Sequence, residues 1–244
     1  MFQGQQGIRD AYRDQGVASR YIDERFRQPL GALLHKRQAA ALRRLLGRKR
    51  PCRVLEIAPG PGRLTTEIAD LPGIRGTVLD SSAQMLEQAH RRVAPVGGSR
   101  WDFVHGDAFN LPFDAQFDAV FVFRLVRHFT DGDRLRLYAE CARVLKPGGL
   151  LVFDAINEHV SVRLRQGSDE AEYPVFDALL TPDRLRAELG SAGFQVSALQ
   201  GVQRHYSLLR QIQVLAAPRS SMLARAAMEV VDRFGGGQPL EWIV

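Results

Sequence analysis

The sequence is poor in cysteine and lysine and has no long apolar run. Its two cysteines, Cys52 and Cys141, are too few for a disulfide framework and are not spaced like zinc ligands. None of the six histidines has ligand spacing either, so we expect no metal. No run of about 18 apolar residues occurs, and no apolar stretch follows basic residues at the N-terminus. The sequence therefore predicts a cytoplasmic protein with two buried free thiols and no membrane span.

Acidic residues are missing from one segment. Between Glu24 and Glu56 there is no aspartate or glutamate, whereas ten arginines and lysines fall there, and the whole chain has a formal charge of +6. Such a segment can grip RNA phosphates, contact an anionic membrane through residues 29–50, or form the solvated face of a packed helix. We prefer the packed helix, because lysines are few and Phe26 is the only aromatic residue of the segment.

Helical patterns come first along the chain. Over residues 29–47, Pro29 suits the first helical turn, leucines and alanines recur along one stripe, and Gly47 can end the helix. A shorter helical segment is expected at residues 8–27. Together these segments predict an N-terminal helical cap over residues 1–50.

From residue 53 onward, short apolar runs alternate with helical patterns. The expected strands are 53–57, 76–79, 101–105, 117–123 and 150–153, and the expected helices between them are 64–71, 84–93 and 133–145. Such runs are typical of a parallel sheet covered on both faces. A polar stretch, a helix at 182–189 and a sixth strand at 194–202 follow. The pattern predicts a doubly wound α/β core over residues 51–204.

Residues 205–244 allow two interpretations. In the one that we favour, helices at 208–216 and 222–234 end at a run of three glycines, and residues 240–244 form the seventh strand of a mostly parallel sheet. In the other, residues 211–216 form the seventh strand and residues 219–244 are a tail. The favoured interpretation completes the same α/β domain.

A glycine loop follows the first strand, with the sequence Glu56-Ile57-Ala58-Pro59-Gly60-Pro61-Gly62. Glycines let the backbone approach a ligand closely. A dinucleotide-binding fingerprint needs glycine at residue 65, where Thr65 stands, and an acid such as Glu56 suits a cationic ligand better than a pyrophosphate. Taken alone, the loop can also be a tight turn between a strand and a helix.

Two further acids end the second and third strands. Asp80 follows the loop by about 20 residues, where a carboxylate can accept hydrogen bonds from both ribose hydroxyls. Asp107 is placed to meet an adenine edge. Each aspartate alone can be a turn cap. Three acids at the carboxyl ends of neighbouring strands together predict a ligand crevice at that edge.

With these motifs the chain resembles the class I S-adenosylmethionine-dependent methyltransferases over about residues 50–200. The glycine loop is similar to the family's first motif, with Ala58 in the place of its first glycine. Later motifs of the family are matched by Gly106-Asp107-Ala108-Phe109, Phe117-Asp118-Ala119-Val120-Phe121 and Leu145-Lys146-Pro147-Gly148-Gly149. We expect Asp118 to be structural.

The resemblance implies that the chain binds S-adenosylmethionine and releases S-adenosylhomocysteine. The implied cofactor-binding residues are Glu56, Ala58, Pro59, Gly60, Gly62, Asp80, Ser81, Met85, Asp107, Ala108 and Phe109. Glu56 and the loop are expected to hold the methionine moiety, Asp80 the ribose, and Asp107 with the Ala108 amide the adenine. Met85 packs either on the adenine or in the core.

Three residues are candidates for the chemistry. His128 lies near the expected acceptor site and serves either as a general base or in loop packing. Arg124 is expected to bind an anionic acceptor group or the donor's carboxylate. Tyr21 either closes over the donor or anchors the N-terminal helix. Because the methyl donor is already activated, positioning is the main task and a dedicated base is not required.

The predicted function is methyl transfer to a small organic acceptor at oxygen, nitrogen or carbon. The chain resembles the quinone-biosynthesis and natural-product branch of the family, and we expect residues 157–177 and 204–206 to choose the acceptor. Two alternatives stay open. One is an RNA methyltransferase that uses the basic segment, and the other is a non-catalytic scaffold that docks on a membrane or an acidic partner.

Overall fold

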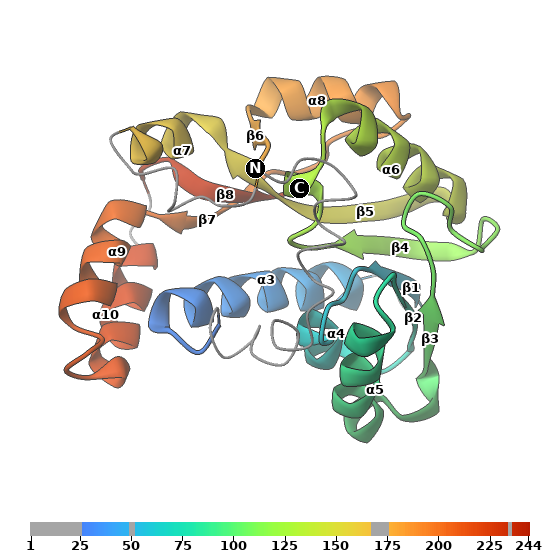
Figure 1. The fold of residues 1–244 in the computed structure, drawn as a ribbon, viewed down its shortest axis with the longest axis horizontal. Helices are drawn as coiled ribbons and strands as arrows, with labels where there is room; N and C mark the ends of the chain where they lie inside the picture. Colours follow the sequence, from blue (N-terminus) through green and yellow to red (C-terminus); the bar gives the residue numbers. More distant parts are fainter. Residues whose placement is uncertain (1–25, 49–51, 167–175, 234–235) are drawn as a thin grey trace.

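The computed structural model describes residues 26–48, 52–166, 176–233 and 236–244. The expected segment 8–27 and Tyr21 therefore fall outside the described residues, apart from the end of that segment. The labels follow Figure 1. In chain order the elements are α3 (Pro29–Gly47), β1 (Cys52–Ile57), α4 (Arg63–Ile68), β2 (Ile74–Asp80), α5 (Ala83–Gly97), η1 (Gly98–Arg100), β3 (Trp101–His105), β4 (Phe117–Val122), η2 (Val126–His128), α6 (Asp131–Val144), β5 (Leu145–Asn157), α7 (Glu158–Arg165), β6 (Leu179–Leu180), α8 (Pro182–Ser191), β7 (Gln200–Arg204), α9 (Tyr206–Leu215), α10 (Ser221–Arg233) and β8 (Pro239–Ile243).

The strands form one twisted sheet in the order β3-β2-β1-β4-β5-β8-β7 (Figure 1). Strands β1 to β5 pair in parallel, whereas β8 is antiparallel to both β5 and β7. In the centre, Leu55 of β1 lies between Thr77 of β2 and Val120 of β4. The predicted doubly wound, mostly parallel α/β sheet is confirmed. The two-residue strand β6, which pairs with β5, was not predicted.

Alternate residues of each strand face two different helical layers. Val54 of β1 packs in one apolar cluster with Leu42 of α3. Its neighbour Leu55 packs in the other cluster, with Leu137 of α6 and Leu185 of α8. In Figure 1, α3, α4 and α5 lie on one side of the strands and α6 and α8 on the other. Burial on both faces explains why the strands read as continuous apolar runs.

Helix α3 has the bounds expected from the sequence, but it is built into the core of one sheet face. Its apolar residues, among them Leu42 and Leu46, are buried against the sheet. Much of its basic face is paired within the chain: the pairs are Lys36–Glu229 (2.6 Å), Arg37–Asp232 (2.6 Å) and Arg43–Asp70 (2.9 Å). The described part of the basic segment therefore fits the packed-helix interpretation.

The C-terminal part follows the favoured interpretation, with helices α9 and α10 before strand β8. The expected sixth strand at 194–202 is wrong in extent, since β7 begins at Gln200. Its partner β8 offers pairing positions only from Pro239 to Ile243, so Phe194 and Val196 pack on the core without strand pairing. No helix within the described residues is long and apolar enough to cross a bilayer.

Strand β5 begins earlier than expected. Leu145 already pairs with Phe117 of β4, and the next pair is Leu150 with Ala119. The four residues between Leu145 and Leu150 form an irregularity, in which Gly148 has a φ of 71°. The predicted turn is thus a bulge inside the strand.

Candidate active site

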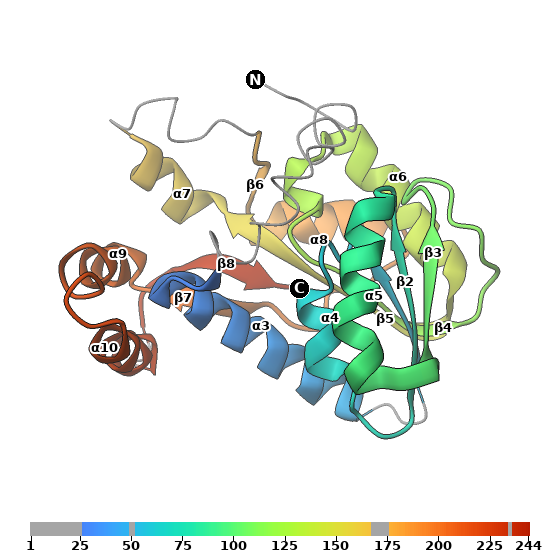
Figure 2. The same cartoon turned by 60° about the horizontal axis from the view of Figure 1, so that its bottom comes forward.

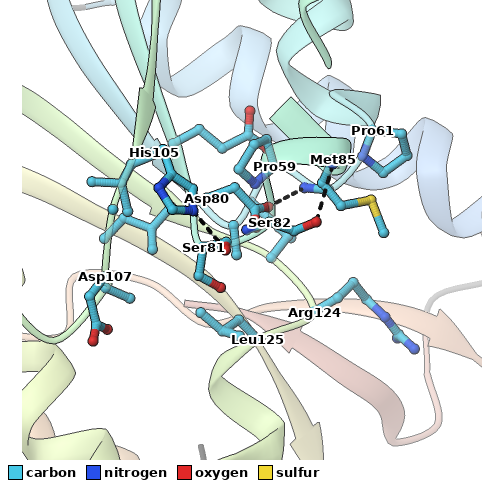
Figure 3. A pocket seen from close by; sticks show the side chains of 18 of the residues that line it. Pro59, Pro61, Asp80, Ser81, Ser82, Met85, His105, Asp107, Arg124 and Leu125 are labelled. Atoms are coloured by element: carbon cyan, nitrogen blue, oxygen red, sulfur yellow. Dashed lines mark hydrogen bonds between the residues drawn. The ribbon is translucent and has the colours of Figure 1, made fainter. Parts of the chain in front are cut away.

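A cavity of about 560 Å³ opens at the carboxyl ends of β1, β2, β3 and β4 (Figure 3). In an open α/β sheet this edge carries the ligand crevice, and this volume is typical of small-molecule sites. The lining includes ten of the predicted cofactor-binding residues: Glu56, Ala58, Pro59, Gly60, Asp80, Ser81, Met85, Asp107, Ala108 and Phe109. The residues predicted to bind the cofactor therefore lie together at one edge of the sheet, and their role in binding stays a prediction.

The loop between β1 and α4 uses left-handed backbone conformations, with φ of 53° at Ala58, 54° at Gly60 and 74° at Gly62. A Cβ at Gly60 would meet no atom within 4 Å. A Cβ at Gly62 would lie 3.0 Å from the Cα of Ala89, so this glycine lets α5 approach the loop. Gly62 therefore serves packing and does not line the cavity. Ala58 adopts a conformation that costs an alanine about 1 kcal/mol.

Glu56 is the acid beneath the loop, and only 3% of its surface is exposed. Its carboxylate accepts a hydrogen bond from the hydroxyl of Thr65, the residue at the place of the missing fingerprint glycine. Burial raises the pKa of Glu56 to about 8, although the Thr65 hydroxyl and the charge of Arg63 act in the opposite direction. A ligand cation beside this carboxyl group would favour its ionised form.

Asp80 ends β2 and points to the cavity between the loop and Ser82 (Figure 3). Its Oδ1 accepts a hydrogen bond from the Ser82 amide (2.9 Å) and its Oδ2 from the Gly60 amide (3.3 Å). Each carboxylate oxygen has two lone pairs, so each keeps one for a ligand hydroxyl. Burial raises the pKa of Asp80 to about 6, against the effect of these two amides.

The third acid, Asp107, shapes the loop after β3. Its Oδ1 accepts a hydrogen bond from the Phe109 amide (3.0 Å), and its carbonyl accepts one from the Asn110 amide (3.1 Å). This turn holds Ala108 and Phe109 in the cavity wall. Met85 is buried in the opposite wall and belongs to neither apolar cluster of the sheet. Of its two expected places, the structure gives it the cavity.

Arg124 stands at the end of β4 and takes part in a buried cluster of charges. It has a φ of 66°, its amide donates to Oδ1 of Asp154 (2.5 Å), and its Nη1 donates to Oε1 of Glu241 (3.0 Å). Arg127 is also buried; it pairs with Asp154 and lies 2.9 Å from Oε1 of Glu241. Burial alone would raise the pKa of Asp154, but the two arginines outweigh it and lower that pKa. Two cations and two anions thus neutralise one another.

A second cavity, of about 430 Å³, shares Arg124 with the first. Its walls come from the start of α3, the end of β5, and α7, β7, α9 and β8. Apolar residues such as Leu34, Ile156 and Leu240 alternate there with polar ones such as Gln203. Parts of the predicted acceptor segments 157–177 and 204–206 border this second cavity.

Comparisons with known proteins agree with this geometry. Residues 54–149 match the model of a methyltransferase domain family. Over 104 residues the chain is 42% identical to the demethylmenaquinone methyltransferase of Thermotoga maritima, and this match covers 42% of each protein. Over 141 residues it is 36% identical to the ubiquinone/menaquinone biosynthesis C-methyltransferase of Pseudomonas savastanoi pv. phaseolicola, covering 54% of this chain and 53% of that protein. Residues 54–149 therefore form a methyltransferase domain, and this part of the chain resembles the class I S-adenosylmethionine-dependent methyltransferases. The chain spans about half the length of these relatives.

Solved structures give the same fold. The glycopeptide N-methyltransferase MtfA in complex with sinefungin superposes with a TM-score of 0.55 at 25% identity, over 68% of this chain and 78% of that one. The [4+2]-cyclase SpnF superposes with a TM-score of 0.61 at 21% identity, over 85% and 78%. The second name shows that this fold also carries other chemistry. The fold alone therefore does not decide the activity, which depends on the residues of the site.

S-adenosylmethionine is the cofactor of this methyltransferase domain, and the cavity fits it. The Gly60 position leaves open space beside the backbone, the Asp80 carboxylate keeps acceptor capacity for a ligand hydroxyl, and Glu56 is a buried acid whose ionised form suits an ammonium group. The volume and the mixture of polar and apolar walls suit a ligand of this size.

His128, one of the residues predicted to act in the chemistry, does not reach the walls of either cavity. His128 is 5% exposed and lines neither cavity; its Nδ1 donates to the Phe176 carbonyl (2.8 Å), and burial lowers its pKa to about 4. This placement matches the loop-packing interpretation of His128. Tyr21 lies outside the described residues. Arg124 lines both cavities, as a residue between donor and acceptor would.

The sequence analysis missed Arg63 and the partners of Arg124. Arg63 begins α4 and lines the first cavity; its Nη1 contacts Nδ1 of His35 (2.8 Å), and its guanidinium lies 4.0 Å from the centre of the Phe26 ring. A basic residue directly after the glycine loop was the available signal. Asp154 and Glu241 could have been noticed as charged residues inside apolar strands.

Proposed function

We propose that the chain transfers a methyl group from S-adenosylmethionine to a small organic acceptor. The observation that carries this proposal is the arrangement of three acids, Glu56, Asp80 and Asp107, around one cavity of about 560 Å³. Each acid lies at the carboxyl end of a different parallel strand, and each is assigned to a different part of S-adenosylmethionine. The whole activity is a proposal, because the relatives are matched over about half of their length.

The donor's polar groups each find a partner in the first cavity. The ammonium group is placed at Glu56, and the carboxylate at Arg63, which lies close enough to lower the pKa of Glu56. The ribose hydroxyls are placed at the two oxygens of Asp80. The adenine is placed between Met85 and the 107–109 turn. A charge-assisted hydrogen bond at each end fixes the orientation of the donor.

The acceptor is placed in the second cavity, on the other side of Arg124. The Arg124 amide donates to Asp154 and its guanidinium donates to Glu241, which lines the second cavity, so both the backbone and the side chain of Arg124 are fixed. Because the cluster is neutral as a whole, it does not demand a charged acceptor. The apolar walls and scattered amide side chains suit a neutral ring that carries hydroxyl or carbonyl groups.

The residues contribute positioning rather than acid-base chemistry. When bound, S-adenosylmethionine supplies a methyl group on a cationic sulfur, so that the bond from acceptor to methyl forms as the sulfur-methyl bond breaks. The cavity walls hold the acceptor nucleophile in line with that bond and exclude water. His128 lines neither cavity, and His105, which lines the first cavity, donates its Nε2 hydrogen to the Ser81 carbonyl (3.1 Å). After the transfer, the proton of a neutral acceptor leaves to solvent. An acceptor that is already ionised has lost this proton before the transfer.

The two sequence relatives favour a quinol ring as the acceptor to test, because they are named a demethylmenaquinone methyltransferase and a ubiquinone/menaquinone biosynthesis C-methyltransferase; the second name points to methylation at carbon. An RNA acceptor is less favoured, since Lys36, Arg37 and Arg43 are engaged by acids of the same chain. The ring chemistry also agrees with the apolar walls of the second cavity.

Calorimetric titration tests the donor site first. S-adenosylmethionine and S-adenosylhomocysteine should both saturate the protein, NADH should not bind, and Asp80→Asn should weaken both adenosyl ligands at least ~tenfold. Asp183→Asn is the matched control, because that side chain is 96% exposed and lies on α8. Incubation with reduced quinones and mass spectrometry then tests the acceptor. Absence of adenosyl binding by folded protein would refute the proposal.

A further inference from the structure

The hairpin of α9 and α10 exposes an unusual share of large apolar side chains. Of the nine most exposed large hydrophobic residues in the described part of the chain, six lie on this hairpin. Four of these flank the turn between the helices, and each is between 61% and 74% exposed: Val214, Leu215, Met222 and Leu223. An exposed apolar group of this kind marks an interaction surface.

The other side of the hairpin is firmly packed. Leu209 of α9 and Met228 of α10 are fully buried against Leu33 of α3. The two helices therefore carry apolar residues on the inner face and again on the outer face and tip. A helix that is apolar on both sides is normally covered on both. Only the inner side is covered within the described chain.

The charge around the exposed residues is positive. Both acids of α10, Glu229 and Asp232, are paired with Lys36 and Arg37 of α3 and so face inward. The exposed Arg219 and Arg225 donate to backbone carbonyls, of Leu215 and Arg27, which leaves their charges uncompensated by these contacts. The outer surface thus combines an apolar tip with arginines beside it.

We propose that the tip of this hairpin, residues 214–223, inserts into the surface of a bilayer that contains anionic lipid. A monotopic membrane contact needs apolar side chains flanked by arginines. The apolar side chains enter the boundary between headgroups and acyl chains, and the arginines bind the lipid phosphates. A second copy of the chain fits less well, because a two-fold contact would place the same arginines against each other. Tyr206 and Gln213 of α9 line the second cavity, so the proposed membrane contact lies next to that cavity.

Vesicle flotation of the full chain tests this contact. Wild-type protein should float with vesicles of phosphatidylcholine mixed with phosphatidylglycerol, and much less with phosphatidylcholine alone. The triple variant Leu215→Gln, Met222→Gln, Leu223→Gln should lose at least ~tenfold in partitioning, because each side chain gives up apolar burial. Arg219→Gln should lose about fivefold, and only with the anionic vesicles. Leu135→Gln is the control and should float like wild type, because Leu135 is an exposed residue of α6, a helix that lies across the molecule from α9 and α10 (Figure 1 and Figure 2).

Three outcomes would overturn the proposal. If folded wild-type protein floats with neither kind of vesicle, the hairpin makes no membrane contact. Flotation that is unchanged in the triple variant places the contact elsewhere. A dimer in light scattering without vesicles, abolished by the triple variant, assigns the tip to a second copy. S-adenosylmethionine binding, which does not involve the hairpin, should be equal in all variants and reports that each is folded.

Discussion

Replacing Glu56 by glutamine should make the ligand-free protein more stable at alkaline pH. The variant keeps the shape of the side chain and an oxygen for the Thr65 hydroxyl, but it cannot ionise. In the folded chain, burial raises the pKa of Glu56 from 4.5 to about 8. An acid whose pKa is raised by folding contributes its full stability below pH 4.5, and this contribution is lost as the pH rises through 8. The variant lacks this loss.

The size of the effect follows from the two pKa values. The difference between 4.5 and about 8 corresponds to about 5 kcal/mol of unfolding free energy once the pH is well above 8. Between pH 5 and pH 8 the expected loss is about 3–4 kcal/mol. Because Glu56 is 3% exposed, solvent screening reduces this figure little.

Urea unfolding at pH 5 and pH 8 measures this difference without ligand. Wild-type protein should lose about 3–4 kcal/mol more than Glu56→Gln over this interval. Glu87→Gln, whose side chain is 63% exposed, should follow wild type. Titrating groups away from residue 56 act equally in all three proteins and cancel in the comparison, whereas Asp80, whose charge raises the pKa of Glu56, is the neighbouring acid that does not. Parallel pH dependences of wild type and Glu56→Gln would refute the reasoning, since they would mean that Glu56 is ionised in the ligand-free fold.

Three further predictions concern the donor site and the core. Calorimetry should show S-adenosylmethionine affinity rising up to about tenfold per pH unit between pH 6 and 8, and much less in Glu56→Gln, because an ammonium group needs the ionised acid. In urea unfolding, Arg127→Met should cost about 3–5 kcal/mol, because the buried Asp154 carboxylate loses its guanidinium partner, whereas the exposed Arg184→Gln should cost at most about 1 kcal/mol. Thermal unfolding should show that Gly62→Ala is worse than Gly148→Ala: both have positive φ, but only the first brings a Cβ against a helix backbone.

The parts of the site that sequence could predict are those with local signals. Glu56, Asp80 and Asp107 were found because each stands where an apolar strand pattern ends, and strands in parallel order must end at one edge. The glycine loop added the backbone that bends next to Glu56. Helix α3 was predicted with its bounds, because Pro29 and Gly47 mark its two ends.

The parts that sequence could not predict depend on distant partners. Arg124 and Glu241 are 117 positions apart and meet only because β8 is inserted between β5 and β7. The length of β7 is likewise set by β8 and not by its own apolar pattern. His128 is near the end of β4 in sequence, but the η2 turn buries it against residues 176 and 177. Such contacts carry no signal at the spacing of a single element.

The cluster of Arg124, Arg127, Asp154 and Glu241 has a cost that its position explains. Buried ion pairs seldom stabilise a fold better than apolar residues of the same size would, and Arg124 adds a left-handed backbone conformation. Such strain persists where the surroundings fix it, and here the Asp154 carboxylate holds the Arg124 amide. The cluster ties β4, η2, β5 and β8 together at the wall between the two cavities. A reaction that depends on the alignment of two molecules across that wall gains most from rigidity at this point. This gain in rigidity accounts for the four charges in the core.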